Sequence, residues 1–367
     1  MTKYFLLFFL FIFLKPSVNA QVYINPGVDT TDQNIKGAVE FYSKYMSEFK
    51  GRKLPDFTKY WNAEDCSRLK VPDRGVYGLG GDYPIYAMAA SKTITYVKPN
   101  TDGTIVLKTI GAIVDSLKNM EVYYISKHFL KKEADNKYHF ISLLEHDKTN
   151  WKSQKIRNVN YAFKKDYPFN KAKADSLITS IVALEKQWNL QPIEIEYILT
   201  NTYDEIQSIK GFDFTLGLGN ADKPSGMADI NDKIVYCAGH GENYFHEVVH
   251  VYLNPKHPKS PLNEGLAVFY GGSMGKPLNW HRERLKTYLN KHPEINLNKL
   301  EDFWQMDNYT NPNSTIQGIL CHEVYKRKGI DGLKNLMRYE SLNEIFEKEF
   351  KFELKNLNRD LRELIGG

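Results

Sequence analysis

Cysteine is scarce in this chain, which has only three among its 367 residues: Cys66, Cys237 and Cys321. Three thiols form at most one disulfide, so a small scaffold held together by many cross-links is excluded. None of them has a second cysteine at the spacing of a thiolate metal site. We interpret all three as small buried side chains. One long-range disulfide is allowed, and the sequence leaves the pairing open.

An excess of charge of one sign is also missing. The sequence has 49 basic and 44 acidic side chains and a formal net charge of +5, and 47 basic side chains remain without Lys3 and Lys15. No block of lysine and arginine stands out, which argues against nucleic acid or another polyanion as a partner. The hydrophobic fraction of 42% and the charged fraction of 25% are globular values, and the length allows two hydrophobic cores.

Long apolar runs are confined to the N-terminus. Residues 4–14 form an unbroken apolar stretch behind Lys3, and Val18-Asn19-Ala20 presents small residues at the positions that a signal peptidase reads. This stretch is too short to cross a hydrocarbon core of about 30 Å. We expect residues 1–20 to be a signal peptide cut after Ala20, and hence a secreted or periplasmic protein with no stable membrane span after cleavage.

The residues best suited to chemistry form the sequence His-Glu-Val-Val-His at positions 246–250, followed fourteen residues later by Glu264. On a helix, His246 and His250 project from one face a single turn apart, where two imidazoles can bind one zinc ion. A hydrolytic zinc site has three protein ligands and a fourth position for water, and Glu264 is placed to be the third ligand. Glu247 can accept the proton of that water and deliver it to a leaving amine.

The flanking sequence favours a pair of helices. Apolar residues between 244 and 252 give the motif a buried helical body, and Pro255 ends that helix. A second helix is expected after Pro261, ending at Gly271 and Gly272. Glu264 therefore falls in the first turn of a helix that returns past the two histidines.

Two other ligand schemes fail on spacing. A metzincin site needs a glycine three residues after the second histidine and a third histidine six residues after it. Here Leu253 occupies the first position and His257 comes one residue too late, so we interpret His257 as a solvated loop residue. A second His-Glu pair begins at His322, but Lys326 stands where its closing histidine would be. We expect His322 to lie on a helix, in the core or lining a pocket.

With these residues the chain resembles the gluzincin metallopeptidases of the peptidase MA superfamily, in which His-Glu-x-x-His on one helix is completed by a glutamate in an Asn-Glu-Gly-Leu-Ala-like stretch on the next. The resemblance implies that His246, His250 and Glu264 bind one Zn²⁺ and that Glu247 is the general base. It extends from near Phe169 to the C-terminus. Only thirteen residues separate His250 from Glu264, fewer than in the thermolysin-like and aminopeptidase branches, so the connecting loop must be short.

Composition and pattern change near residue 165, where we place a domain boundary. Before it we expect helices at 34–46 and 54–61, and strands rich in Tyr, Ile, Val and Phe at 83–96, 104–113, 121–130, 138–145 and 156–163. The fold class is therefore α+β. Residues 21–165 are expected to form a small α+β domain with an antiparallel sheet and a role that the sequence leaves open, and residues 166–367 the zinc metallopeptidase domain.

Within the second domain the pattern predicts a helix at 172–188 and strands at 193–199 and 227–237. The resemblance implies a mixed sheet plus an active-site helix, with an edge strand beside the cleft to which an extended peptide can pair, so we expect substrate along residues 226–232. It also implies a helical C-terminal subdomain as the other wall, and the pattern predicts helices at 281–290, 297–304, 315–327, 331–339 and 342–364, the last with a break near 351.

A hydrolase of this kind also needs a hydrogen-bond donor to the oxyanion that forms when water attacks a carbonyl. Similar enzymes take a tyrosine or histidine from the helical subdomain, where Tyr309, His322 and Tyr325 are candidates, and His240 could serve from the other wall. Since 24 residues are tyrosines, each one also fits plain packing. Asn263, next to the third ligand, fits either the orientation of a ligand or the capping of a helix.

The resulting hypothesis is an exported zinc-dependent peptidase that acts on a peptide or protein substrate, with Glu247 as general base. The alternative is a catalytically silent binding or scaffold protein that retains a gluzincin-like metal site. The presence of all four chemical positions argues against this alternative, because a decayed enzyme commonly loses the general base first. Substrate, cleavage specificity, endopeptidase or exopeptidase action, and oligomeric state stay open.

Overall fold

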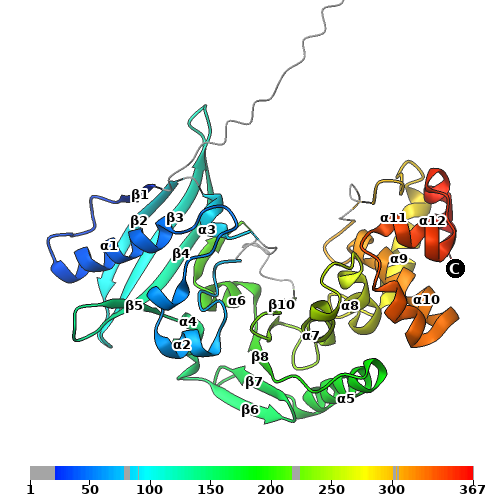
Figure 1. Ribbon diagram of the computed structural model, residues 1–367, viewed down its shortest axis with the longest axis horizontal. Coiled ribbons are helices and arrows are strands. Elements are labelled where there is room, and N and C mark those ends of the chain that lie inside the picture. Colours follow the sequence, from blue (N-terminus) through cyan, green and yellow to red (C-terminus); the bar gives the residue numbers. More distant parts are fainter. Residues whose placement is uncertain are drawn as a thin grey trace, which may run out of the picture. The chain divides into compact units, whose positions relative to one another are not determined.

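The computed structural model describes residues 21–77, 83–89, 91–216, 224–300, 303 and 306–366, so the expected signal peptide lies outside the described residues. The architecture is mixed α+β and has two compact units (Figure 1). The first unit comprises Met1–Tyr60, Gly75–Phe140 and Phe212–Leu216, and the second comprises Trp61–Arg74, Ile141–Gly211 and Gly217–Gly367. The boundary expected at residue 165 thus falls inside the second unit, which is assembled from three stretches of chain.

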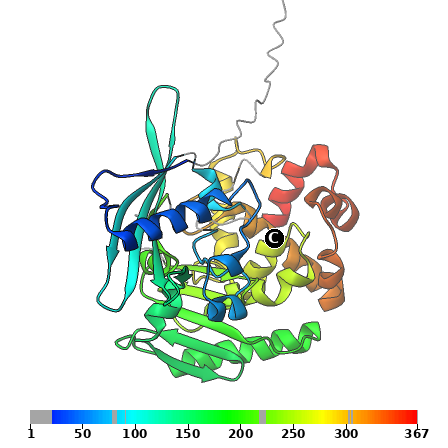
Figure 2. The same cartoon turned by 60° about the vertical axis from the view of Figure 1, so that its left-hand side comes forward.

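The first unit is built on a six-stranded sheet whose longest strands form the hairpin β3–β4 (Figure 2). β1 pairs in parallel with β2, so the sheet is mixed where we expected an antiparallel one. Its strands are β1 (Gln21–Ile24), β2 (Ser91–Pro99), β3 (Thr104–Val114), β4 (Met120–Lys132), β5 (Tyr138–Ile141) and β9 (Phe212–Thr215). Helix α1 (Gln33–Ser47) begins at Asp32, whose carboxylate accepts hydrogen bonds from two backbone amides of the first turn, and it buries one face that includes Tyr42 and Tyr45.

Three expectations for the first half of the chain are wrong in detail. The strand expected from residue 83 starts later, because Ile85–Met88 form the short helix α3. The helix expected at 54–61 is reduced to the 3₁₀ turn η1 (Phe57–Lys59). The strand expected to reach residue 145 ends at Ile141, because Ser142 accepts a hydrogen bond from the Glu145 amide and starts α4 (Leu143–Lys148).

The second unit contains a five-stranded sheet in the order β10-β11-β8-β7-β6. β11, β8 and β7 are parallel to one another, and the outer strands β10 and β6 run antiparallel to their neighbours. β11 is entirely buried, as expected for a strand of a parallel core. The strands are β6 (Lys152–Ile156), β7 (Val159–Phe163), β8 (Ile195–Thr200), β10 (Ser225–Asp229) and β11 (Ile234–Ala238).

Two hairpins belong to this sheet: β6–β7, of which we expected only the second strand, and β10–β11, for which we expected a single strand. Residues 152–163 turn at Arg157, whose φ of 53° is in the left-handed region, and residues 225–238 turn before Lys233, whose φ is 56°. β6 and β7 thus belong to the sheet of the second unit. The second hairpin leaves β10 at the edge of the sheet, whereas β11, the strand just before the motif helix, is an inner strand. The expected edge strand is therefore one strand earlier in the chain than the expectation had it.

Helices make up the remainder of the second unit. Besides α4, the helices described in this unit are α2 (Ala63–Arg68), α5 (Lys171–Trp188), α6 (Tyr203–Ile209), α7 (Phe245–Leu253), η2 (Asn254–Lys256), α8 (Asn263–Gly271), α9 (Leu278–Lys291), α10 (Pro312–Leu336), α11 (Leu342–Glu344), η4 (Ile345–Phe350), η5 (Leu354–Asn356) and α12 (Leu357–Gly366). Gly329, with φ 62° and ψ −157°, interrupts α10, and Lys351 breaks the last helical segment as expected. Residues 297–299 are not helical, and residues 301, 302 and 304 of the helix expected there lie outside the described residues.

One hydrophobic core joins the sheet of the second unit to its C-terminal helices. Cys66, Cys237 and Cys321 form no disulfide with one another, and burial strongly raises the pKa of Cys321. The three thiols therefore form no cross-link, which leaves packing to hold the fold. Among the described residues, no helix combines the length and apolarity needed to cross a membrane.

Candidate metal centre

Helix α7 carries the two motif histidines and is buried along its length from His246 to Leu253. Its apolar residues pack into the core of the second unit. The polar side chains of the same helix are therefore buried as well, and burying a charged group without a partner costs free energy. His246 and His250 lie one turn apart, and their Nε2 atoms are 3.2 Å apart. The predicted helical face is therefore formed.

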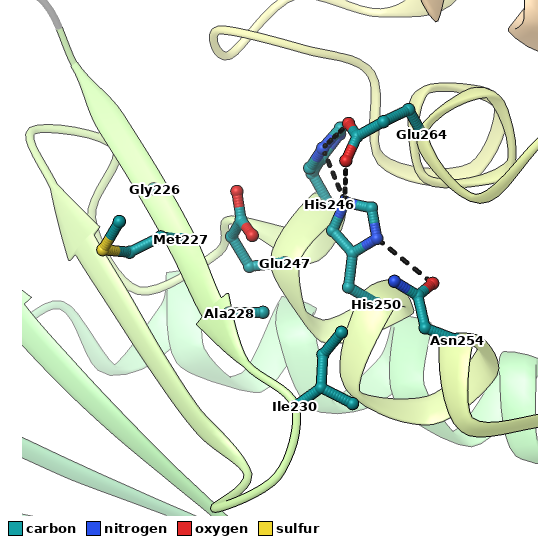
Figure 3. A pocket seen from close by; sticks show the side chains of 9 residues that line it. All are labelled: Gly226, Met227, Ala228, Ile230, His246, Glu247, His250, Asn254 and Glu264. Carbon is teal, nitrogen blue, oxygen red and sulfur yellow. Dashed lines mark hydrogen bonds and ion pairs between the residues drawn. The ribbon is translucent and has the colours of Figure 1, made fainter. Parts of the chain in front are cut away.

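Helix α8 returns past α7 and brings Glu264 to the histidines, as Figure 3 shows. Oε1 of Glu264 lies 3.4 Å from Nε2 of His250, and Oε2 lies 3.6 Å from Nε2 of His246. One ligand atom from each of the three residues lies within 4.8 Å of the other two. The loop between the helices is short, as the spacing requires, and contains the turn η2.

Glycines allow α8 to approach its neighbours closely enough for this geometry. A Cβ atom at Gly271 would lie 2.4 Å from the backbone nitrogen of His246, and one at Gly265 would lie 2.3 Å from Cβ of Gln317 on α10. Both distances are shorter than carbon atoms tolerate, so a larger residue would separate the helices. The glycines therefore help to set the distance from Glu264 to the histidines.

Both imidazoles are oriented by hydrogen bonds at their other nitrogen. Nδ1 of His246 donates to the carbonyl of Gly272 over 2.6 Å, and Nδ1 of His250 donates to Oδ1 of Asn254 over 3.3 Å. Partners of this kind place the proton on Nδ1 and leave a lone pair on Nε2. Neither Gly272 nor Asn254 was predicted from the sequence, although Asn254 follows His250 at the helical spacing of four residues.

The three ligand atoms fit a zinc ion. Two nitrogens bound tetrahedrally at 2.0–2.1 Å are about 3.4 Å apart, and the observed separation of the two Nε2 atoms is 3.2 Å. In the absence of metal, burial alone would lower the pKa of His250, but the Glu264 carboxylate raises that pKa to about 9. The cluster thus favours a positive charge between the histidines, and a metal ion would displace the proton.

Glu247 lies on the side of α7 that faces β10, and Figure 3 places its carboxyl group between that strand and the histidines. Its side chain is buried, and burial raises its pKa although the nearby histidines lower it in part. A raised pKa suits a carboxylate that must accept a proton near neutral pH.

These groups open into a pocket of about 370 Å³. One wall is β10 with the turn that follows it, and the other is formed by α7 and by Glu264, whose side chain is 62% exposed. The lining residues are Gly226, Met227, Ala228, Ile230, His246, Glu247, His250, Asn254 and Glu264. The pocket therefore unites the predicted ligands, the predicted base and the first residues of the segment where we expected substrate.

The predicted oxyanion donors do not line this pocket. Tyr309 is 49% exposed, and the only pairing of the His322 ring with a carboxylate among the described residues is with its neighbour Glu323. The hydroxyl of Tyr325 accepts a hydrogen bond from Gln187, which is a packing role. Among the described residues, the pocket contains no tyrosine, so the identity of a donor stays a prediction.

Three other polar residues near the motif pack against, or hydrogen-bond to, neighbouring residues outside the pocket. The ring of His240 stacks on Tyr244 with 3.9 Å between centroids, and burial lowers the pKa of His240 to about 4. His257 packs edge-on against Trp188, where we expected a solvated side chain. The amide of Asn263 donates to the carbonyl of His257 and ties the loop to the start of α8, which is neither of the two roles expected for it.

The site thus presents two imidazoles and a carboxylate as possible ligands, a buried second carboxylate, and an open side next to an edge strand. This donor set matches the preference of zinc for nitrogen and oxygen ligands. No protein-family model, curated protein or solved structure matches the chain.

Proposed function

We propose that this protein is an exported zinc-dependent peptidase of the gluzincin kind, with His246, His250 and Glu264 as the ligands of one zinc ion. The observation that carries the proposal is the convergence of these three ligand atoms with the buried carboxylate of Glu247 in one pocket. Bound zinc would lower the pKa of a coordinated water and polarise the carbonyl that is attacked.

In this proposal, Glu247 acts first as general base and then as general acid. Its carboxylate takes a proton from the attacking water and returns it to the leaving amine, and its raised pKa favours the first of these transfers. The hydrogen bonds to Gly272 and Asn254 keep the two imidazoles aimed at the same point throughout.

In this proposal, β10 is the strand to which the substrate backbone binds. It is the terminal strand of its sheet, so one edge of its backbone has no neighbouring strand among the described residues. An extended peptide can add to such an edge through backbone hydrogen bonds. This would place a scissile bond beside Glu247, because β10 and α7 line the same pocket.

The test compares the purified protein with its Glu247→Gln variant on casein and on a diverse peptide library. We expect one zinc per chain in both proteins, cleavage by the wild type that stops with a chelator and returns with zinc, and a loss of turnover of about 10²–10⁴-fold in the variant. Glu363→Gln, which changes a carboxylate that is 73% exposed, is the matched control and should retain full activity.

Two outcomes would contradict the proposal. Undiminished cleavage by Glu247→Gln with full zinc content would exclude its role as base. A wild-type protein that binds zinc but cleaves nothing in the library would favour the silent binding protein.

A further inference from the structure

The strand that forms one wall of the pocket has little support of its own. β10 has five residues, pairs only with β11 among the described strands, and presents partly exposed side chains along its length. The turn after it carries Ile230, which also lines the pocket. A short edge strand of this kind frays easily unless side chains fix it.

Arg74 fixes this strand from a segment that lies far away in the sequence. Its guanidinium forms ion pairs with Asp229, the last residue of β10, and with Asp232, which lies in the turn. The bond from Nη1 to Oδ2 of Asp232 is 2.7 Å long. Arg74 and Asp232 have side chains that are 3% and 1% exposed, so the pair is shielded from water and held in one geometry.

The backbone before Arg74 reinforces the same contact. The amide of Lys70 donates to Oδ1 of Asp232 over 2.6 Å, and the amide of Val71 donates to Oδ2 over 3.3 Å. The amide of Asp232 in turn donates to Oδ1 of Asp229 over 3.3 Å. Both ends of the turn that carries Ile230 are therefore tied to one buried cation and to the segment at residues 70–74.

We propose that Arg74 is a positioning residue of the peptidase: it clamps the β10–β11 turn and so holds the pocket wall on which the substrate backbone pairs. This inference rests on the proposed function. Arg74 does not line the pocket, so it acts through Asp229 and Asp232 and not on the reacting atoms. The planar fork of arginine suits the task, because it can pair with two carboxylates in fixed directions, which the single ammonium of lysine cannot do.

Arg68 offers a matched control in the same part of the chain. It pairs with both carboxylate oxygens of Glu145, at 2.7 and 3.0 Å, but its side chain is 41% exposed. Neither Arg68 nor Glu145 lines the pocket. Arg68→Lys therefore removes a similar fork without touching β10, and solvent screens the loss.

The experiment measures kcat, KM, zinc content and hydrogen exchange for Arg74→Lys, Asp229→Asn and Arg68→Lys. For peptides long enough to pair with β10, we expect Arg74→Lys to raise KM about tenfold and to change kcat less than about twofold, with one zinc per chain. Asp229→Asn removes one of the two ion pairs and should act in the same direction less strongly. Arg68→Lys should match the wild type. A general loss of folding would lower zinc content and kcat together, so the KM-specific pattern separates positioning from simple destabilisation.

Hydrogen exchange tests the clamp without any catalysis. In Arg74→Lys, the amides of residues 225–229 should lose protection by about tenfold or more while those of β8 keep theirs. Unchanged protection of β10, or an unchanged KM in a variant with lost protection, would overturn the inference. If the wild type cleaves no peptide, the proposed function fails. The exchange of the β10 amides in Arg74→Lys still tests the clamp in that case: reduced protection supports it, and unchanged protection contradicts it.

Discussion

Replacing Gly271 by alanine should weaken zinc binding without unfolding the protein. The new Cβ atom would lie 2.4 Å from the backbone nitrogen of His246 and 2.7 Å from its Cα atom. These are backbone atoms, so no side chain can rotate away, and α8 must move by about 1 Å to restore an ordinary carbon contact. The carbonyl of Gly272 would move with it.

The size of the effect follows from the hydrogen bond that this movement breaks. Nδ1 of His246 is 2.6 Å from the Gly272 carbonyl, and an added displacement of about 1 Å takes the pair beyond hydrogen-bond distance. Loss of a partner that orients a metal-binding histidine typically costs about 10–100-fold in affinity, or about 1.4–2.7 kcal/mol. Movement of α8 also displaces Glu264, which adds to the loss.

The assay is a competition titration with a chromogenic zinc chelator, accompanied by urea denaturation to show that the variant is folded. Gly366→Ala is the matched control, because a Cβ atom at that helical glycine would meet nothing within 4 Å. Its zinc affinity should equal that of the wild type. The reasoning is refuted if folded Gly271→Ala binds zinc as tightly as the wild type does.

Two further predictions concern stability. Tyr252→Phe removes a buried hydroxyl that accepts from Asn158 and donates to Glu185, and the stranded groups should lower the free energy of unfolding by about 1–3 kcal/mol in urea titrations; an unchanged midpoint would contradict it. Lys92 is fully buried with its ammonium near the Ala89 carbonyl, and burial lowers its pKa from 10.5 to about 8. Between these values the unfolded chain binds more protons than the folded one, so stability should rise with pH across that window. Lys92→Met should abolish this rise and stabilise the protein by about 2 kcal/mol at pH 7, and a pH dependence that survives the substitution would refute the assignment.

The cluster of His246, His250 and Glu264 could be predicted because its determinants are local. Periodicity and Pro255 define α7, and Gly271 ends α8, so both helices follow from a few neighbouring residues. The position of Glu264 in the first turn of α8 then places its carboxylate near the histidines. Sequence reasoning could thus bring these three side chains together before any tertiary contact was known.

Short polar turns were harder to predict. Ser142 and Glu145 form an N-terminal helix signal that the Tyr- and Phe-rich strand pattern before them obscured. Arg157 and Lys233 adopt left-handed backbone conformations that asparagine or glycine would have marked more clearly. The missed turn before Lys233 joined β10 and β11 into one expected strand, and β6 before Arg157 was not expected at all. The boundary near residue 165 separated β6 and β7 from their sheet, because their partner β8 lies more than thirty residues later in the sequence.

Long-range electrostatic contacts carry no local signal at all. Arg74 and Asp229 are 155 residues apart, and nothing in either sequence neighbourhood marks them as partners. The orienting carbonyl of Gly272 belongs to the same class, because a backbone atom leaves no compositional trace. Such contacts are available only from the three-dimensional structure.

The assembly of the second unit from three separated stretches has a consequence for the order of events during synthesis. At 5–20 residues per second, the chain from Arg74 to Asp229 takes roughly 10–30 s to make. During that time the residues of Trp61–Arg74 have already emerged, while the aspartates that will enclose the guanidinium do not yet exist. The intervening stretch Gly75–Phe140 belongs to the first unit, most of whose sheet can pair in the meantime. Until then the early segment lacks the carboxylates that pair with Arg74, and the histidine–carboxylate cluster can close only when synthesis is past Glu264.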